Sequence, residues 1–220
     1  VARKLAHEIK NPLTPIQLSL DRLKEKYSNR LNGEKQEFQN YLLTINRQIK
    51  DIEDLVNEFS NFARMPRPIL KKIDLVKILK RSINLLNLSS KHKLNFLNKD
   101  EQFMILGDEE QLNRVFLNLI KNAEEAIDEK TKKSKDFKGK IDIEITDNND
   151  YIVITFIDNG TGVSDTKKAM TPYYTTKTKG TGLGLPIVLK IISDHSGEFL
   201  LKNKTKNSGA EVRITLPKTI

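Results

Sequence analysis

Residues 5–16 read Leu-Ala-His-Glu-Ile-Lys-Asn-Pro-Leu-Thr-Pro-Ile, near the start of a chain of 220 residues. At about 100° per residue of an α-helix, the apolar side chains of this segment form one stripe that continues to Leu23. His7 lies nearly opposite the stripe, so we expect its imidazole to face solvent. Glu8 is adjacent, and Asn11 shares the same face one turn later. A solvated imidazole beside a carboxylate and an amide indicates a reactive site, which by itself could serve a metal, a proton shuttle or a partner protein.

Two long amphipathic helices are predicted at the N-terminus, one from the start to about Tyr27 and one from about Glu34 to Ala63. Pro12 removes a backbone donor and clashes with the preceding turn, so a kink just after His7 is expected. The short connection between the helices makes them an antiparallel hairpin. One hairpin leaves much of its apolar stripe uncovered, and a second copy of the chain would complete a dimeric four-helix bundle.

The segment Met65-Pro66-Arg67-Pro68 cannot continue a helix, because each proline lacks a backbone donor and restricts the residue before it. It indicates a boundary between a domain of residues 1–65 and a second domain of residues 66–220. In the second domain, periodicity and turn residues predict three helices and a mostly antiparallel sheet. The helices are expected from Asp74 to Leu86, Glu109 to Asp128 and Leu185 to Ser193, and the strands near residues 94–97, 103–106, 141–146, 151–157, 198–201 and 211–216. This order indicates an α+β chain whose second domain is a two-layer α/β sandwich.

The composition, with 37% hydrophobic and 30% charged residues, is typical of a soluble globular protein, and no apolar run approaches the ~20 residues that span a bilayer. The chain has no cysteine, which is compatible with a cytoplasmic location. It begins with Val1 inside a helical pattern, so we expect a fragment of a longer protein, in which a signal or membrane segment could precede it. The net charge of +9 comes mainly from two expected loops, residues 130–140 and 163–180, so direct nucleic-acid binding is not expected.

Two glycine clusters flank expected elements of the second domain. Asp158-Asn159-Gly160-Thr161-Gly162 follows an apolar strand, and Gly180-Thr181-Gly182-Leu183-Gly184 precedes a helix. The second cluster can present backbone donors and a helix N-terminus to an anion, and Lys177 and Lys179 add positive charge. Neither cluster matches the Walker phosphate loop or the dinucleotide fingerprint. The residues from 160 to 184 are not expected to form a regular element.

Asn118 and Asn122 are four residues apart, so they share a face of the expected helix at 109–128. Asparagine is a mediocre helix former, and a pair of them on one face needs a reason. The two residues could be solvated or capping amides. Alternatively, their oxygens could ligate a hard cation such as Mg²⁺, which takes the rest of its shell from water and nucleotide phosphates.

Together these segments resemble the sensor histidine kinases of two-component signalling. Residues 7–13 resemble the H box of that family, Asn118 to Ala123 the N box, and the clusters at 158–162 and 180–184 its two glycine boxes. Their order and spacing also agree, and the resemblance spans essentially the whole chain. Segments 14–20 and 172–177 are most similar to the nitrogen-regulation branch of the family.

The resemblance implies a hairpin for dimerisation and phosphotransfer, followed by an ATP-binding domain of the Bergerat type, as in gyrase and Hsp90. It makes His7 the phosphoacceptor, Glu8 the acceptor of the imidazole proton, and Asn11 the residue that positions water when the partner is dephosphorylated. The implied activity is ATP-dependent autophosphorylation of His7 and transfer of the phosphoryl group to an aspartate of a response regulator receiver domain. The lower half of the hairpin is the expected docking surface for that regulator.

In the ATP-binding domain, the resemblance assigns Asn122 to Mg²⁺ and places Asn118 near the phosphates. Asp158 would read the adenine amino group, and Gly160 and Gly162 would form the turn beneath the base. The remaining predicted contacts are with the phosphates, made by Lys177 and by the backbone of Gly180, Gly182, Leu183 and Gly184.

Two rival functions are also considered. A Bergerat ATPase acting as a conformational clamp would have no use for an exposed His7 with Glu8 and Asn11. A basic helical nucleic-acid-binding module would carry a lysine or arginine stripe on a helix, whereas the excess here is expected in loops. His92, in a polar turn, and His195, as a helix-end charge or a partly packed ring, are not expected to be catalytic.

Overall fold

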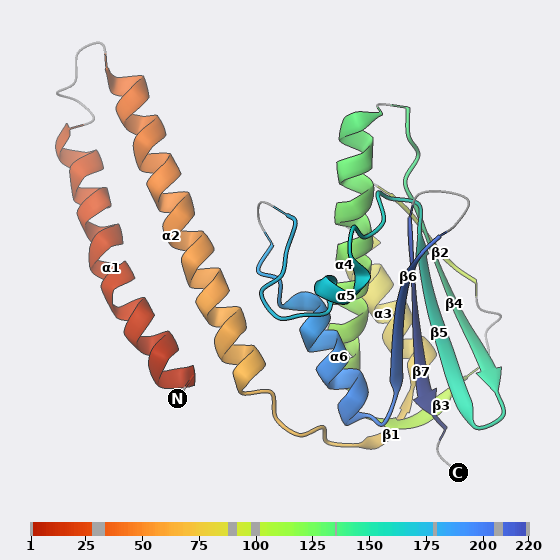
Figure 1. The fold of residues 1–220 in the computed structure, drawn as a ribbon. Coiled ribbons are helices and arrows are strands. Elements are labelled where there is room, and N and C mark those ends of the chain that lie inside the picture. The colour runs from red at the N-terminus through yellow and green to blue at the C-terminus, as the bar shows by residue number, and fades with distance from the viewer. Residues whose placement is uncertain are drawn as a thin grey trace. The chain divides into compact units, whose positions relative to one another are not determined.

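The computed structural model describes residues 2–27, 34–87, 92–97, 102–134, 136–177, 180–204 and 209–218, with the backbone alone described for residues 2–8 and 87. The chain divides into two compact units, residues 1–66 with 176–183 and residues 67–175 with 184–220. The first unit contains the two long N-terminal helices, and the second contains the strands and the other helices (Figure 1). Within the part of the chain that is described, no helix has both the length and the apolar character needed to cross a membrane.

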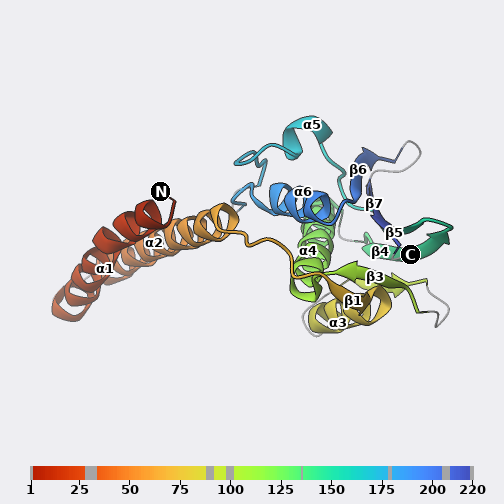
Figure 2. The same cartoon turned by 90° about the horizontal axis from the view of Figure 1, so that it is seen from below.

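The N-terminal helices are α1 (Ala2–Tyr27) and α2 (Lys35–Ala63), which pack side by side as an antiparallel hairpin (Figures 1 and 2). Both predicted helices are therefore confirmed, and α1 stays helical through its two prolines. The hairpin core consists of alternate members of the predicted stripes, Leu13, Leu20, Leu42 and Ile49, with Phe38 packed against it. The intervening members remain 37–45% exposed: Ile9, Ile16, Leu23, Ile45 and Ile52. One hairpin therefore buries only part of its apolar stripe.

The second unit is built on a five-stranded sheet in the order β2-β4-β5-β7-β6. The strands are β2 (Lys93–Phe96), β4 (Lys140–Asn148), β5 (Tyr151–Asp158), β6 (Glu198–Asn203) and β7 (Ala210–Pro217). Only the β2–β4 pair is parallel, and the other three pairs are antiparallel. The prediction of a mostly antiparallel sheet is confirmed, and the most apolar strand, β5, occupies its centre. In β4, Ile141, Ile143 and Ile145 are buried while Glu144 and Thr146 are exposed, as their alternation predicts.

Three helices, α3 (Leu75–Asn87), α4 (Glu109–Lys133) and α6 (Gly184–Asp194), cover one face of this sheet (Figures 1 and 2). The core between the layers includes Phe116 and Ile120 of α4, which are fully buried. The ring of Phe116 lies 6.0 Å from that of Phe156 in β5. Each such side chain contributes about 1.5–3 kcal/mol to folding by leaving water. The predicted two-layer α/β sandwich is therefore confirmed.

Three details of the sequence prediction are wrong. The strand expected at residues 103–106 is β3 (Met104–Gly107), which pairs with an unpredicted strand, β1 (Lys71–Asp74), in a separate antiparallel sheet. β1 gave no periodic signal because only Ile73 of its four residues is buried. The segment 160–184 contains a short helix, α5 (Thr166–Ala169), whose first backbone N–H groups are capped by the side chain of Asp165.

The third error concerns the expected basic loop at residues 130–140. Helix α4 continues to Lys133, so Lys130, Lys132 and Lys133 form its last turn. Lysines in this position interact favourably with the negative end of the helix dipole, which favours helix over loop. Lys133 also pairs with Glu129 one turn earlier, at 3.2 Å. The charge of these residues therefore belongs to a helix end.

Asp108 joins three parts of the second unit. Its Oδ1 accepts the backbone N–H groups of Glu110 and Gln111 at 3.1 Å, which caps α4, and its Oδ2 accepts the N–H of Ile69 at 2.9 Å. Burial raises the pKa of Asp108, but these three N–H groups outweigh it, so the pKa lies below its ordinary value. The backbone N–H of Asp108 donates to Nε2 of His195 at 2.9 Å.

His195 is a packed, buried residue directly after the end of α6. Because its Nε2 accepts from Asp108, its Nδ1 carries the proton that bonds the carbonyl oxygen of Ile191 at 2.8 Å. Both ring nitrogens are thus used within the fold, and 5% of the residue is exposed. His92 pairs through Nε2 with Asp128 at 2.8 Å.

Replacing Asp108 with alanine is expected to lower the free energy of unfolding by about 1–2 kcal/mol, because it removes a helix cap and the bond from Ile69. Asp108→Asn keeps an acceptor and should cost less. A carboxylate with a lowered pKa stabilises the fold above its unfolded pKa of about 3.9, and this contribution disappears as the pH falls through the folded pKa. Chemical denaturation at pH 7 and below pH 4 measures both effects. An Asp108→Ala deficit that does not shrink in acid would contradict this assignment.

Candidate functional site

The segment that carries His7 lies in the first half of α1. The side chains of His7 and Glu8 lie outside the described residues, so their exposure and contacts stay predictions. Asn11, one turn further along the helix, is exposed to solvent. The buried face of this helix is marked instead by Leu13 and Leu20. The described part of α1 therefore has the polar and apolar faces that the sequence predicts.

One face of α4 forms the centre of the candidate site in the second unit. This face carries Asn118, Asn122 and Ala126 at intervals of one turn, over about 12 Å of helix. Neither asparagine lies at a helix end, which excludes a capping role. The Nδ2 of Asn118 donates to the carbonyl oxygen of Arg114 at 2.9 Å. This bond fixes the amide and leaves its oxygen as the acceptor for other groups.

The N-terminus of α6 lies beside this asparagine pair. A Cβ atom added at Gly184 would lie 3.3 Å from Oδ1 of Asn118 and 3.9 Å from Nδ2 of Asn122. Two segments that are far apart in the sequence thus meet where a helix presents its positive dipole end and its first N–H groups. This end of α4 combines amide oxygens, which suit a hard cation, with backbone donors, which suit an anion.

The other end of the same face meets the turn that follows Asp158, the last residue of β5. Asp158 is 7% exposed, and its Oδ1 accepts the backbone N–H groups of Gly160 at 2.8 Å and Ala210 at 3.3 Å. Burial raises the pKa of Asp158, and the two N–H groups and nearby lysines oppose this only in part. Both of these hydrogen bonds go to Oδ1, and each of the two oxygens of a carboxylate can accept hydrogen bonds. The carboxylate can therefore accept a further hydrogen bond from a ligand.

The turn after Asp158 lies directly against α4. A Cβ atom at Gly160 would be 2.6–2.8 Å from backbone atoms of Ala126 and Ile127, so only glycine permits this approach. The backbone N–H of Thr161 donates to the carbonyl oxygen of Ala126 at 3.2 Å. Gly162 has a φ of 76°, in the left-handed region. The predicted glycine turn and the predicted asparagine helix thus form one structural site.

Sequence reasoning missed Gly209 as part of this arrangement. It has a φ of 136°, and an added Cβ atom there would overlap the carbonyl oxygen of Asp158. This glycine allows the start of β7 to approach the end of β5, so that the N–H of Ala210 reaches the Asp158 carboxylate. A single glycine before an expected strand was the only sequence signal, and it is common in ordinary turns.

Most of the second glycine cluster belongs to segment 176–183, which groups with the first unit. Within it, Gly182 has a φ of 69°, Leu183 is fully buried, and the N–H of Gly180 donates to the carbonyl oxygen of Lys177 at 3.4 Å. Lys179 lies outside the described residues. The proximity of Lys177, Gly180, Gly182 and Leu183 to the asparagines therefore stays a prediction, and Gly184 alone of the cluster is placed beside them.

The chemistry of this site is different at its two ends. At one end, a buried carboxylate can accept a hydrogen bond from an N–H donor. At the other end, the amide oxygens suit a cation and the helix N-terminus suits an anion. The two asparagines are neutral, so much of the charge that would hold a divalent cation must come from the ligand, as nucleotide phosphates supply it. The donor set therefore fits a nucleotide with Mg²⁺.

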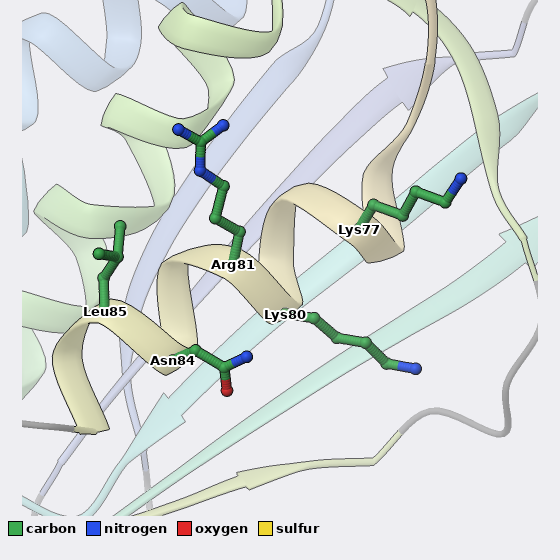
Figure 3. Close-up of a pocket in the computed structure, with 5 residues that line it drawn as sticks. All are labelled: Lys77, Lys80, Arg81, Asn84 and Leu85. Carbon is green, nitrogen blue, oxygen red and sulfur yellow. The ribbon is translucent and has the colours of Figure 1, made fainter.

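A separate hollow of about 480 Å³ lies on the surface of α3 (Figure 3). Its lining residues are Lys77, Lys80, Arg81, Asn84 and Leu85, none of which was predicted as a site residue. The cations show that the basic excess is not confined to loops, contrary to the sequence interpretation. Arg81 pairs with Glu109 at 3.1 Å, which neutralises part of this surface.

Comparison with known families gives two matches that follow one another along the chain. Residues 1–68 match the family described as His Kinase A (phospho-acceptor) domain. Residues 107–220 match the family described as histidine kinase-, DNA gyrase B- and HSP90-like ATPase. The second match includes the asparagine helix and both glycine clusters, and the first includes His7.

Similar proteins carry related names. The chain is 38% identical over 220 residues to the nitrogen regulation protein NtrY of Azorhizobium caulinodans, covering 98% of this chain and 28% of that protein. It is 42% identical over 207 residues to a putative sensor histidine kinase, NtrY-like, of Rickettsia conorii, covering 93% of this chain and 33% of that protein. The chain thus spans about a third or less of these relatives.

Among solved structures, histidine kinase ThkA in complex with the response regulator protein TrrA matches 99% of this chain and 60% of that chain. The TM-score is 0.65 at 21% identity, a level at which the likeness shows the fold alone. The family matches and the NtrY relatives confirm the resemblance read from the four sequence motifs.

A methyl group at position 160 is expected to push the glycine turn away from α4. Gly160→Ala should lower the free energy of unfolding by about 1–3 kcal/mol, because the added Cβ meets backbone atoms that cannot move aside. Gly184→Ala is the matched control, since the nearest atom there is a side-chain oxygen at 3.3 Å, and it should cost less. Denaturant unfolding of both variants measures the difference. Equal losses would show that the turn does not need a glycine at 160.

Proposed function

Because the chain belongs to the sensor histidine kinases of the NtrY-like branch, whose ATPase domain is shared with DNA gyrase B and HSP90, we propose that it phosphorylates itself on His7 with ATP and passes the phosphoryl group to a response regulator. One observation supports this most directly. The amide pair of α4 and the N-terminus of α6 lie at one end of a helix face whose other end meets the glycine turn that follows the buried carboxylate of Asp158. That arrangement suits a nucleotide, and the other half of the chain carries the phospho-acceptor match.

The two family matches support the proposed domain assignment. Residues 1–65 form the dimerisation and histidine phosphotransfer domain, and residues 66–220 form the catalytic ATP-binding domain. In the second, Asp158 accepts a hydrogen bond from the adenine amino group, and Gly160 and Gly162 form the turn beneath the base. Its phosphate contacts come from Asn118, Lys177, Gly180, Gly182, Leu183 and Gly184.

Asn122 is proposed to hold Mg²⁺, which would supply charge neutralisation at the phosphates. The protein's own contribution at that end is positional. The Asn118 amide is fixed by its bond to Arg114, and the first N–H groups of α6 are held in place by the helix. Phosphoryl transfer depends mainly on such positioning and on charge, so the fixed amides and helix end meet its main requirement.

At His7, a neutral ring nitrogen forms a bond to the terminal phosphorus of ATP while the bond from that phosphorus to the bridging oxygen breaks. ADP leaves with the electron pair, and Glu8 accepts the proton that the imidazole releases. The phosphoryl group then moves from the imidazole to an aspartate of the receiver domain. Asn11 would position water when the regulator is dephosphorylated. We place the reaction in the cytoplasm, where ATP is available.

A homodimer is proposed from the uncovered apolar stripe of the hairpin. Ile9, Ile16 and Leu23 of α1 and Ile45 and Ile52 of α2 are 37–45% exposed and lie next to the buried core residues. A second hairpin would bury them, which completes the four-helix bundle. The regulator is then expected to dock on the lower half of the hairpin, where the two helices connect.

The kinase proposal predicts that the chain, given Mg²⁺ and ATP labelled in the terminal phosphate, acquires an acid-labile and alkali-stable phosphate. His7→Gln should abolish the label, because no other residue is proposed as acceptor. Asp158→Asn should reduce it by weakening ATP binding. Label unchanged in His7→Gln, or absent from a chain verified as a dimer, would overturn the proposal. If the chain hydrolyses ATP but acquires no labelled phosphate, the result would instead support the conformational clamp.

The dimer proposal predicts that Ile45→Glu converts the chain to a monomer, because it places a charge in the apolar interface. Leu43→Glu is the matched control. Leu43 is more exposed, at 67% against 43%, but lies about 100° around the helix from buried Leu42, on the side away from Ile45. Size-exclusion chromatography with light scattering gives the mass of each variant. A dimer that survives Ile45→Glu, or is lost equally in Leu43→Glu, would contradict this interface.

A further inference from the structure

The turn of residues 159–163 is held from the sheet side by Asn203, the last residue of β6. Its Oδ1 accepts the backbone N–H of Val163 at 2.8 Å, and its Nδ2 donates to the carbonyl oxygen of the same residue at 2.6 Å. Both bonds are satisfied in only one orientation of the amide. The amide also lies close to Gly162, where an added Cβ atom would be 2.9 Å from Oδ1. Asn203 therefore fixes the backbone directly after the second glycine of the turn.

The same turn is held from the helix side by Lys130. Its Nζ donates to the carbonyl oxygen of Asn159 at 2.8 Å and to that of Gly160 at 3.3 Å. The ammonium group also lies 4.4 Å from the ring centroid of Phe137, which restricts its movement. Lys130 is two turns beyond Asn122 on α4, and it is one of the charges that oppose the rise in the pKa of Asp158.

Together the two side chains bind four backbone groups of a five-residue turn that contains two glycines. Glycine loses more backbone freedom on ordering than any other residue, so an unrestrained turn of this kind would have to be ordered by its ligand. When the turn is already ordered, binding does not have to pay this loss of conformational entropy. The protein therefore binds the ligand with higher affinity.

We propose that Asn203 and Lys130 are positioning residues that hold the turn of residues 159–163 in the conformation that receives the adenine base. This role rests on the proposed nucleotide site. It adds to that site two residues outside the motifs, which would set the affinity for the base by holding the turn. Neither residue is proposed to touch the phosphates. Their contribution is to affinity for the base, and not to the rate of phosphoryl transfer once ATP is bound.

The test uses the full chain with Mg²⁺ and measures binding of ADP and of inorganic triphosphate by calorimetry, together with KM and kcat for autophosphorylation. Asn203→Ala and Lys130→Met should each weaken ADP binding about tenfold and raise KM for ATP similarly, since each removes two hydrogen bonds. Affinity for triphosphate, which has no base, and kcat should stay within about twofold. Asn203→Asp should weaken ADP binding further, because a carboxylate oxygen would face the carbonyl oxygen of Val163.

Matched controls come from the same kinds of element. Lys133→Met removes a lysine from the same last turn of α4, where it pairs with Glu129, and Asn148→Ala removes the exposed last residue of β4. Both should bind ADP as the unaltered chain does. Thermal unfolding of each variant, read beside its affinity, separates a loss of folded protein from a loss of binding.

The possible outcomes distinguish failure of the proposed nucleotide site from failure of the positioning role alone. If the unaltered chain binds no ADP, the proposed nucleotide site fails and the positioning role fails with it. If the unaltered chain binds ADP and Asp158→Asn does not, but Asn203→Ala and Lys130→Met bind normally, only the positioning role is overturned. Equal losses of ADP and triphosphate affinity would also overturn it, because they would indicate a general structural effect.

Discussion

The packing of α4 against the sheet is the interaction on which the rest of the second unit depends. One side of this helix buries Leu112, Phe116 and Ile120 completely, so its position and rotation are fixed by the core. The adjoining side carries the asparagines and Ala126, which therefore have little freedom of their own. The N-terminus of α6 and the turn after β5 both meet this side. A single well-packed helix thus sets the relative position of groups that come from three distant parts of the sequence.

Close backbone approach is the second constraint, and it explains why glycines occur where they do. Gly160 lets the turn contact α4, and Gly209 lets the start of β7 contact the end of β5. The two contacts bring backbone N–H groups to the Asp158 carboxylate, which is buried and would otherwise be costly to keep charged. Burial nevertheless raises the pKa of Asp158. The two glycines are therefore needed for the hydrogen bonds to the Asp158 carboxylate as well as for the conformation of the turn.

The periodic parts of the fold could be predicted from the sequence, because each long helix or strand buries one face. The predictions failed where packing or capping decided the structure. β1 has a single buried residue, α5 depends on the Asp165 cap, and the last turn of α4 has lysines that also suit a loop. In the site, motif residues such as Asn118 and Asp158 were recognised. Asn203, Lys130 and Gly209 were not, because their role depends on tertiary contacts with residues at least 29 positions away.

In the hairpin, the residues that stabilise the fold and those proposed for the chemistry lie on different faces of the helices. The hairpin core uses alternate members of each apolar stripe, and the intervening members remain partly exposed, where the proposed second copy of the chain would cover them. The face that carries Asn11 contributes nothing to that core, so residues there can be selected for chemistry at little cost to folding. A phosphoacceptor must be reached first by a nucleotide-bearing domain and then by a regulator, and a residue packed into the bundle could meet neither. His7 is predicted to share this face with Asn11 one turn later, and such a placement is what the two proposed transfers would require.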